Sequence, residues 1–176
     1  MNKKLVTYIS LFCGAFIIRL IHLLQWSKAP FFATPTVDEL YHHLWANQIA
    51  SGNLIADGPF FRAPFYPYFL GLIQNIFGDP FFWTRFVQIL IGTVSVLLIY
   101  YLADLIFQNP KKALIPAIIA AIYPPFIFFE TRLLLDFLLV PLTTLSLILL
   151  ILSDKKRSLW LLFLSGLVSG IFAITR

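Results

Sequence analysis

The chain has 176 residues, of which 60% are hydrophobic, 17% are aromatic and only 12% are charged. Soluble domains are nearer half apolar and a quarter charged, so this composition indicates a membrane protein. The net charge of +5 does not indicate nucleic-acid binding, because seven of the 13 basic residues form short clusters between apolar segments: Lys3-Lys4, Lys111-Lys112 and Lys155-Lys156-Arg157. Clusters in such places orient membrane proteins. The single cysteine, Cys13, excludes an internal disulfide.

The predicted membrane spans are apolar segments that approach the required length of about 20 residues. In chain order they are residues 5–26, 81–107, 113–129, 137–152 and 159–175. If the N-terminal lysines are cytoplasmic, all three basic clusters fall on the cytoplasmic side, as the positive-inside rule requires. Six of the eight acidic residues then fall on the external side: Asp38, Glu39, Asp57, Asp79, Glu130 and Asp136. The sequence therefore predicts an all-α, polytopic transmembrane fold with external acidic groups.

The external loop, residues 27–79, is expected to contain two helices at the membrane interface. The first runs from Asp38 to Ala50 and ends near Gly52, and the second runs from near Pro64 to Gly78. A turn is expected between them at Asp57–Pro59. On a helical wheel, one half of the first helix carries Asp38, Glu39, His42, His43 and Asn47, and the other half carries Leu40, Tyr41, Leu44, Trp45 and Gln48. This pattern predicts a helix with its apolar half on the membrane and its polar half in water.

A metal site is one interpretation of the first interfacial helix, because Glu39 and His42 have the E-x-x-H spacing of di-iron proteins. Such a centre needs a second E-x-x-H and further carboxylates. The chain has three histidines, and the remaining one, His22, has no acidic residue three or four positions away. We therefore expect His42 and His43 to be polar residues on the water-facing side of the helix.

Other charged residues lie near the predicted external face. Asp136 is embedded in the apolar stretch "TRLLLDFLLVPL", and an ionisable group in such surroundings is a candidate for function. Glu130 and Arg132 are two residues apart and are expected to pair with each other. Arg19 and Arg85, in the external halves of two spans, are expected to snorkel toward water. External carboxylates, the loop residue Arg62 and an apolar surround together fit chemistry on a lipid-linked phosphate.

Three motifs follow the first predicted span in order: the pair Asp38-Glu39, Ala46 with Gly52 six residues later, and "RAPFYP" from Arg62 to Pro67. This order resembles the first external loop of polyprenyl-phosphate-sugar-dependent glycosyltransferases. These integral-membrane enzymes of the C-type fold include protein O-mannosyltransferases and aminoarabinose transferases. The segment "YPPFIFFETRLLLDFLLVPL" resembles the family's entry into its fourth span, where a further acidic residue is common. The final "GIFAITR" resembles a mid-protein stretch, so we expect the N-terminal part of a longer transferase.

The resemblance implies a mechanism and a set of site residues. Asp38 would deprotonate or orient the acceptor, which displaces the lipid phosphate with inversion at the sugar carbon, while Arg62 would bind the donor phosphate. Glu39 and Asp136 would support Asp38, or Asp38, Glu39 and Asp136 would bind a divalent cation, Mg²⁺ or Mn²⁺; the resemblance leaves the metal requirement open. Secondary candidates at the same site are Glu130, Arg132 and His42.

The expected partners are a polyprenyl-phosphate-linked sugar, a lipid, glycan or protein acceptor, and membrane lipids, with no nucleic acid. The expected location is a bacterial or archaeal plasma membrane, with the active site at the external face. Two alternatives stay open. A non-enzymatic lipid-phosphate-binding or transporter-like subunit would need the arginines but not Asp38, and a structural subunit would need neither.

Overall fold

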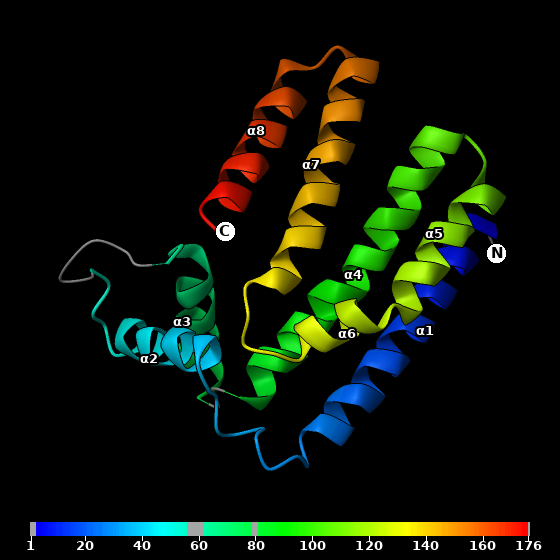
Figure 1. Cartoon of the computed structure of the whole chain (residues 1–176). Coiled ribbons are helices and arrows are strands. Elements are labelled where there is room, and N and C mark those ends of the chain that lie inside the picture. The colour runs from blue at the N-terminus through cyan, green and yellow to red at the C-terminus, as the bar shows by residue number, and fades with distance from the viewer. Residues whose placement is uncertain (1–2, 56–61, 79–80, 176) are drawn as a thin grey trace.

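The structure is a computed structural model that describes residues 3–55, 62–78 and 81–175. These residues form eight helices and no strand (Figure 1). The helices are α1 (Lys3–Trp26), α2 (Asp38–Ala50), α3 (Phe65–Phe77), α4 (Phe82–Phe107), α5 (Pro110–Ile122), α6 (Pro124–Glu130), α7 (Asp136–Lys156) and α8 (Leu159–Ala173). Asp57, Asp79 and the turn expected at Asp57–Pro59 lie outside the described residues.

Three helices, α1, α4 and α7, are long and apolar enough to cross a membrane. Helices α5 and α6 pass the same test only as a pair, because the chain bends by 52° between them. The break follows from "YPP": Pro124 and Pro125 lack backbone N–H groups, and Tyr123 before them takes the extended conformation typical of that position, with φ −70° and ψ 112°. The third predicted span is therefore a broken helix. The fifth is α8, a shorter apolar helix of 15 residues.

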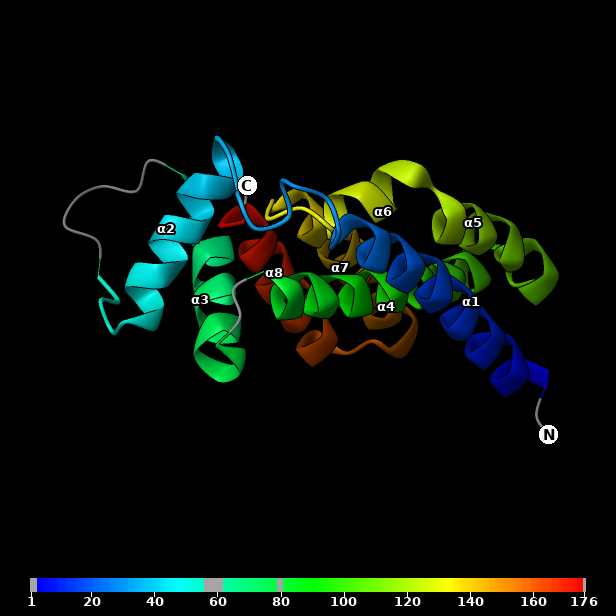
Figure 2. The ribbon, with the colours of Figure 1, turned by 90° about the horizontal axis from the view of Figure 1, so that it is seen from below.

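The helices sort the charged groups to two ends of the molecule. Lys4 lies 3.7 Å from Asp104 at the end of α4, and Lys155 at the end of α7 donates a hydrogen bond of 3.2 Å to the carbonyl of Leu105. The N-terminus of α5 lies at this same end, so the three basic clusters share it (Figure 1). Helices α2 and α3 lie at the other end, as the second view also shows (Figure 2).

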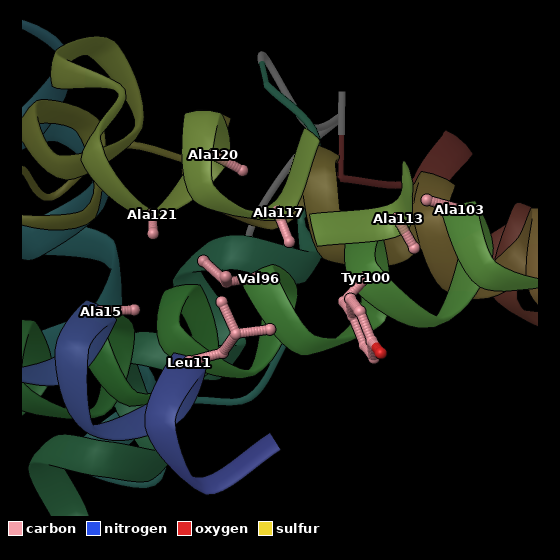
Figure 3. Close-up of a cluster of buried hydrophobic side chains, with 9 residues drawn as sticks. All are labelled: Leu11, Ala15, Val96, Tyr100, Ala103, Ala113, Ala117, Ala120 and Ala121. Atoms are coloured by element: carbon pink, nitrogen blue, oxygen red, sulfur yellow. The ribbon is translucent and has the colours of Figure 1, made fainter. Parts of the chain in front are cut away.

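The largest core cluster joins α1, α4 and α5. Small side chains on α5 allow the helices to approach closely, as is common inside membrane proteins. The cluster comprises Leu11, Ala15, Val96, Tyr100, Ala103, Ala113, Ala117, Ala120 and Ala121 (Figure 3). Alanine contributes no side-chain entropy cost on burial. The alanines of α5 therefore pack closely on α1 and α4, and this packing holds α5 in place up to its turn into α6.

Helix α2 lies on α3, and its orientation differs from the expected one. Its buried residues are Glu39, His42, Trp45, Ala46 and Ile49, whereas Leu40 and Leu44 are exposed. A helix at the membrane interface was expected to contact only water and lipid. In the folded chain the side of α2 that carries Glu39 and His42 packs on other parts of the protein, namely α3 and the segment before α7.

Candidate functional site

The N-terminus of α2 carries an ion pair between two expected site residues. Arg62 Nη2 lies 2.7 Å from Asp38 Oδ1, and the side chains are 36% and 41% exposed respectively. Asp38 lies in the first turn of its helix, where a negative charge is favoured by the helix dipole. The pair is therefore ordered by the fold yet open to a ligand. The structure brings together the expected base and the expected phosphate-binding residue.

Glu39, the neighbour of Asp38, points the other way and is buried. Its Oε1 accepts a hydrogen bond of 3.3 Å from the backbone N–H of Leu133 and lies 3.9 Å from Arg132 Nη1. The Arg132 guanidinium in turn lies over the Trp26 ring, 3.9 Å from its centroid. Glu39 therefore ties α2 to the segment before α7. The expected pairing of Arg132 with Glu130 is wrong.

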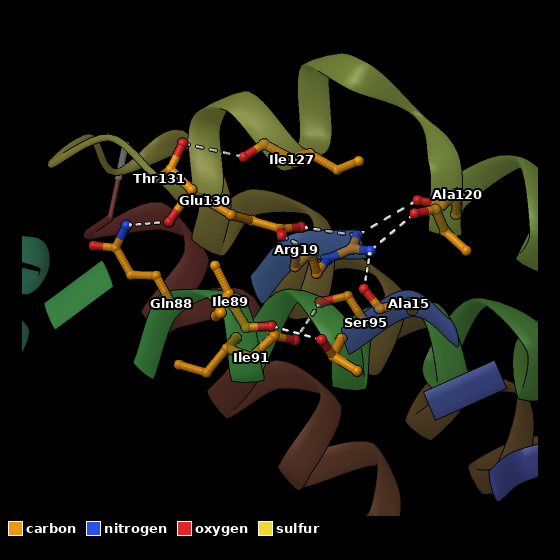
Figure 4. A network of polar contacts seen from close by, with 12 residues as sticks. Ala15, Arg19, Gln88, Ile89, Ile91, Ser95, Ala120, Ile127, Glu130 and Thr131 are labelled. Atoms are coloured by element: carbon orange, nitrogen blue, oxygen red, sulfur yellow. Dashed lines mark hydrogen bonds and ion pairs between the residues drawn. The ribbon is translucent and has the colours of Figure 1, made fainter. Parts of the chain in front are cut away.

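Glu130 pairs instead with Arg19, which is fully buried (Figure 4). Arg19 Nε donates to Glu130 Oε2 at 2.6 Å and Nη2 donates to Oε1 at 3.1 Å, while Nη1 donates to the carbonyl of Ala121 at 3.0 Å. Gly92 on α4 provides the space for this carboxylate, since a Cβ there would overlap it. Arg19 does not snorkel as expected, because a carboxylate and backbone carbonyls satisfy it inside the bundle.

Arg85 is the second arginine that was expected to snorkel and is instead buried. Its Nε donates a hydrogen bond of 2.9 Å to the carbonyl of Thr131, and its guanidinium lies 4.3 Å from the centroid of the Phe32 ring. The planar guanidinium suits both contacts, because it donates in its plane and stacks on its face. Arg85 therefore holds the segment between α6 and α7 against α4.

Gln88, one turn further along α4, was missed by the sequence analysis. Its amide nitrogen donates to the carbonyls of Glu130 at 2.9 Å and Arg132 at 2.7 Å, and its Oε1 accepts from the hydroxyl of Tyr66 at 2.8 Å. Burial raises the pKa of Tyr66 well above its usual value, with Glu39 and Asp136 adding to the rise and Arg85 opposing it. An amide inside an apolar span was the signal that could have identified Gln88.

The two histidines of α2 are not the surface residues that were expected. His42 is only 1% exposed, and its ring lies edge-on to that of Tyr66, with 5.1 Å between the centroids. Burial lowers the pKa of His42 to about 4, with Arg62 adding to the effect and Asp38 opposing it. His43 is half-buried beside Phe81, with 5.0 Å between the ring centroids. Burial and then Arg85 lower the pKa of His43.

Asp136 begins α7 and lines a cavity of about 230 Å³ together with Arg19, Glu130 and Ser95. The rest of the cavity wall is apolar and comes from α4, α6 and α7. The described residues contain no group of three or more His, Cys, Asp or Glu side chains placed to hold a metal ion. Asp38, Glu39 and Asp136 are therefore not gathered into one cluster of carboxylates in this arrangement.

The fold defines a polytopic helical membrane protein, and one end of it carries carboxylates held by arginines. The model of the dolichyl-phosphate-mannose-protein mannosyltransferase family matches residues 61–176, which is more than half of the chain. The chain belongs to this family, and membership implies glycosyltransferase activity. Neither the comparison with curated proteins nor the comparison with solved structures gave a match. The matched range includes Arg62, Gln88 and Asp136 but begins after α2.

Proposed function

We propose that the protein transfers a sugar from a polyprenyl-phosphate donor to a hydroxyl of a lipid, glycan or protein acceptor at the external face of the membrane. The observation that carries this proposal is the contact of 2.7 Å between Asp38 and Arg62, whose side chains are 41% and 36% exposed respectively. Helix α2, which begins at Asp38, lies at the end of the bundle opposite the basic clusters (Figure 1), and this is the external end if those clusters are cytoplasmic. Family membership supports the sugar chemistry.

Asp38 is the base of the proposed reaction. The acceptor oxygen forms a bond to the anomeric carbon of the sugar while the bond from that carbon to the phosphate oxygen breaks. The electron pair of the broken bond stays on the polyprenyl phosphate, and the acceptor proton goes to Asp38. Attack opposite to the leaving group inverts the anomeric centre. General-base help of this kind contributes about 10²–10⁴-fold in rate.

Arg62 links donor binding to the base. In the structure its guanidinium contacts the carboxylate of Asp38. A phosphate offers oxygens that match the same planar donor set, so a bound donor competes with Asp38 for Arg62. When Arg62 turns to the phosphate, the carboxylate loses a donated hydrogen bond and becomes able to accept the acceptor proton. Arg62 then stabilises the charge that develops on the leaving phosphate.

The remaining expected residues support this centre. Glu39 fixes the start of α2 through Leu133 and Arg132, so its role is to position Asp38. Asp136 lies at the cavity between α4, α6 and α7 and adds negative charge near Tyr66. Glu130 holds Arg19 inside the bundle through a buried ion pair, so its role is structural.

The test is donor-dependent sugar transfer by the full-length protein carrying Asp38→Asn or Arg62→Gln. We expect Asp38→Asn to lower kcat by about 10²–10⁴-fold and Arg62→Gln to raise the donor KM as well. Asp104→Asn is the matched control, since Asp104 pairs with Lys4 at the opposite end. A near wild-type rate for Asp38→Asn would remove the base. If the wild-type protein binds the donor through Arg62 but transfers no sugar, a lipid-phosphate-binding subunit is favoured instead.

A further inference from the structure

One buried amide connects the two surfaces that support α2. Gln88 is fully buried on α4 and makes three hydrogen bonds: two donated to the carbonyls of Glu130 and Arg132, and one accepted from Tyr66. The two carbonyls can only accept, so they fix the orientation of the amide and turn its oxygen toward Tyr66. Figure 4 shows the bond from Gln88 to the Glu130 carbonyl.

The first support of α2 is α3. Gly71 lets the two helices approach closely, because a Cβ there would lie 2.8 Å from Cγ2 of Ile49 and 3.1 Å from the carbonyl oxygen of Ala46. Tyr66 packs in one cluster with Ala46 of α2. Its hydroxyl reaches past this cluster to Gln88. The amide therefore fixes α3, and through α3 the body of α2, relative to α4.

The second support of α2 is the segment between α6 and α7. It holds Glu39 through the backbone N–H of Leu133 and the guanidinium of Arg132. The two carbonyls that Gln88 binds belong to Glu130, the last residue of α6, and to Arg132, which immediately precedes Leu133. The path from α4 to Asp38 is therefore short: the amide holds the backbone, the backbone holds Glu39, and Glu39 is bonded in sequence to Asp38.

We propose that Gln88 is a positioning residue for sugar transfer, which sets the place of Asp38 by holding both supports of α2 to the membrane-spanning helix α4. The proposal rests on the proposed function, in which Asp38 is the base. Only a side-chain amide supplies two donors and an acceptor from one planar group at this site. A methionine fills a similar volume but supplies no donor, so it would retain the packing and release the backbone.

The effect should appear in the chemical step. In the proposed function the donor phosphate binds through Arg62, which lies outside the three hydrogen bonds of Gln88, whereas the position of the base depends on α2. Misplacement of a reacting group by about 1 Å costs on the order of 10²-fold in rate. We therefore expect Gln88→Met in the full-length protein to lower kcat by about 10- to 100-fold and to change the donor KM by less than about 3-fold.

Gln74→Met is the matched control. Gln74 is also a buried glutamine, on α3, but its amide nitrogen has no hydrogen-bond partner among the described residues. We expect the kcat and donor KM of the Gln74→Met variant to stay within about 2-fold of wild type. Rates are taken per amount of monodisperse, folded protein. If Gln88→Met yields too little folded protein, Gln88→Asn retains an amide that is one methylene too short to reach both supports, and the same fall in kcat is expected.

A double-mutant cycle distinguishes positioning from general loss of structure. Glu39→Ala interrupts the same path, so the double variant Gln88→Met with Glu39→Ala should be little slower than the slower single variant. The positioning role would be overturned if the loss of kcat in the double variant equalled the product of the two single losses. It would also be overturned if the kcat of Gln88→Met stayed within about 2-fold of wild type. Full activity of Asp38→Asn would instead remove the proposed function itself. A silent Gln88→Met beside an inactive Asp38→Asn would overturn the positioning role alone.

Discussion

The buried pair of Arg19 and Glu130 depends on the absence of a side chain at Gly92. A Cβ built on Gly92 would overlap the carboxyl carbon and both oxygens of Glu130. The carboxylate cannot simply rotate away, because Arg19 binds both of its oxygens, at 2.6 and 3.1 Å. Gly92→Ala therefore either displaces α4 from α6 or breaks the ion pair.

The expected size of this effect follows from two opposing contributions. Breaking a buried ion pair costs about 3–5 kcal/mol, because it leaves uncompensated charge inside the protein. Alanine in a helix interior gains about 0.5–1 kcal/mol over glycine. The net expectation is that Gly92→Ala lowers the free energy of unfolding by about 2–4 kcal/mol.

The assay is reversible unfolding of the full-length protein in mixed detergent micelles, followed by circular dichroism. Gly14→Ala is the matched control, because Gly14 lies inside α1 and an added Cβ there meets nothing within 4 Å. We expect no loss of stability from Gly14→Ala. Equal free energies of unfolding for the two variants would refute this prediction, since Gly92 would then not be needed to make room for the Glu130 carboxylate. In a Glu130→Ala background, Gly92→Ala should cost nothing further.

Two further predictions concern α2. The folded protein keeps His42 neutral down to its pKa of about 4, whereas the unfolded chain protonates it near pH 6.5. The free energy of unfolding should therefore fall as the pH drops from about 6.5 to about 4, by up to about 3 kcal/mol. His42→Phe should lack that part of the fall, and equal pH dependence in both proteins would contradict the buried position. Gly71→Ala should push α2 from α3, because its Cβ would lie 2.8 Å from Ile49 Cγ2, and should destabilise the protein by about 1–3 kcal/mol. Gly166 on α8 has open space around it, so Gly166→Ala should not lower the free energy of unfolding in the same experiment. Equal losses of stability in the Gly71→Ala and Gly166→Ala variants would contradict the close approach of α2 to α3.

The helices were largely predictable from the sequence. The first interfacial helix was expected from Asp38 to Ala50 and is found at those bounds, and the second, expected from near Pro64 to Gly78, is α3. Local signals suffice for these two helices: an acidic first turn in the first, a proline at the start of the second, and a glycine soon after the last turn of each. They did not suffice at "YPP", where one span over residues 113–129 was expected and the chain instead bends between α5 and α6. The family resemblance was confirmed by the match over residues 61–176.

The burial of α2 was not predictable in the same way. The wheel placed His42 on the water-facing half, but His42 is buried because α3 packs against that half. The hydrophobic pattern of a short helix reports its average surroundings and cannot tell lipid from a neighbouring helix. The same limit explains why Gln88 was missed: its three partners come from α3, from the last residue of α6 and from the segment after α6, and no spacing in the sequence relates them.

The sequence by itself determined the membrane helices and the separation of charges to the two ends. The bilayer imposes a length on each apolar segment and a side on each basic cluster, and both requirements act on local stretches of chain. Only the tertiary structure decided which acid meets which arginine. Arg19 and Glu130 are 111 residues apart, and proximity in sequence had favoured the wrong partner, Arg132. A charge buried among packed helices must be neutralised by whatever group the packing brings within a few ångströms, and that choice belongs to the whole fold.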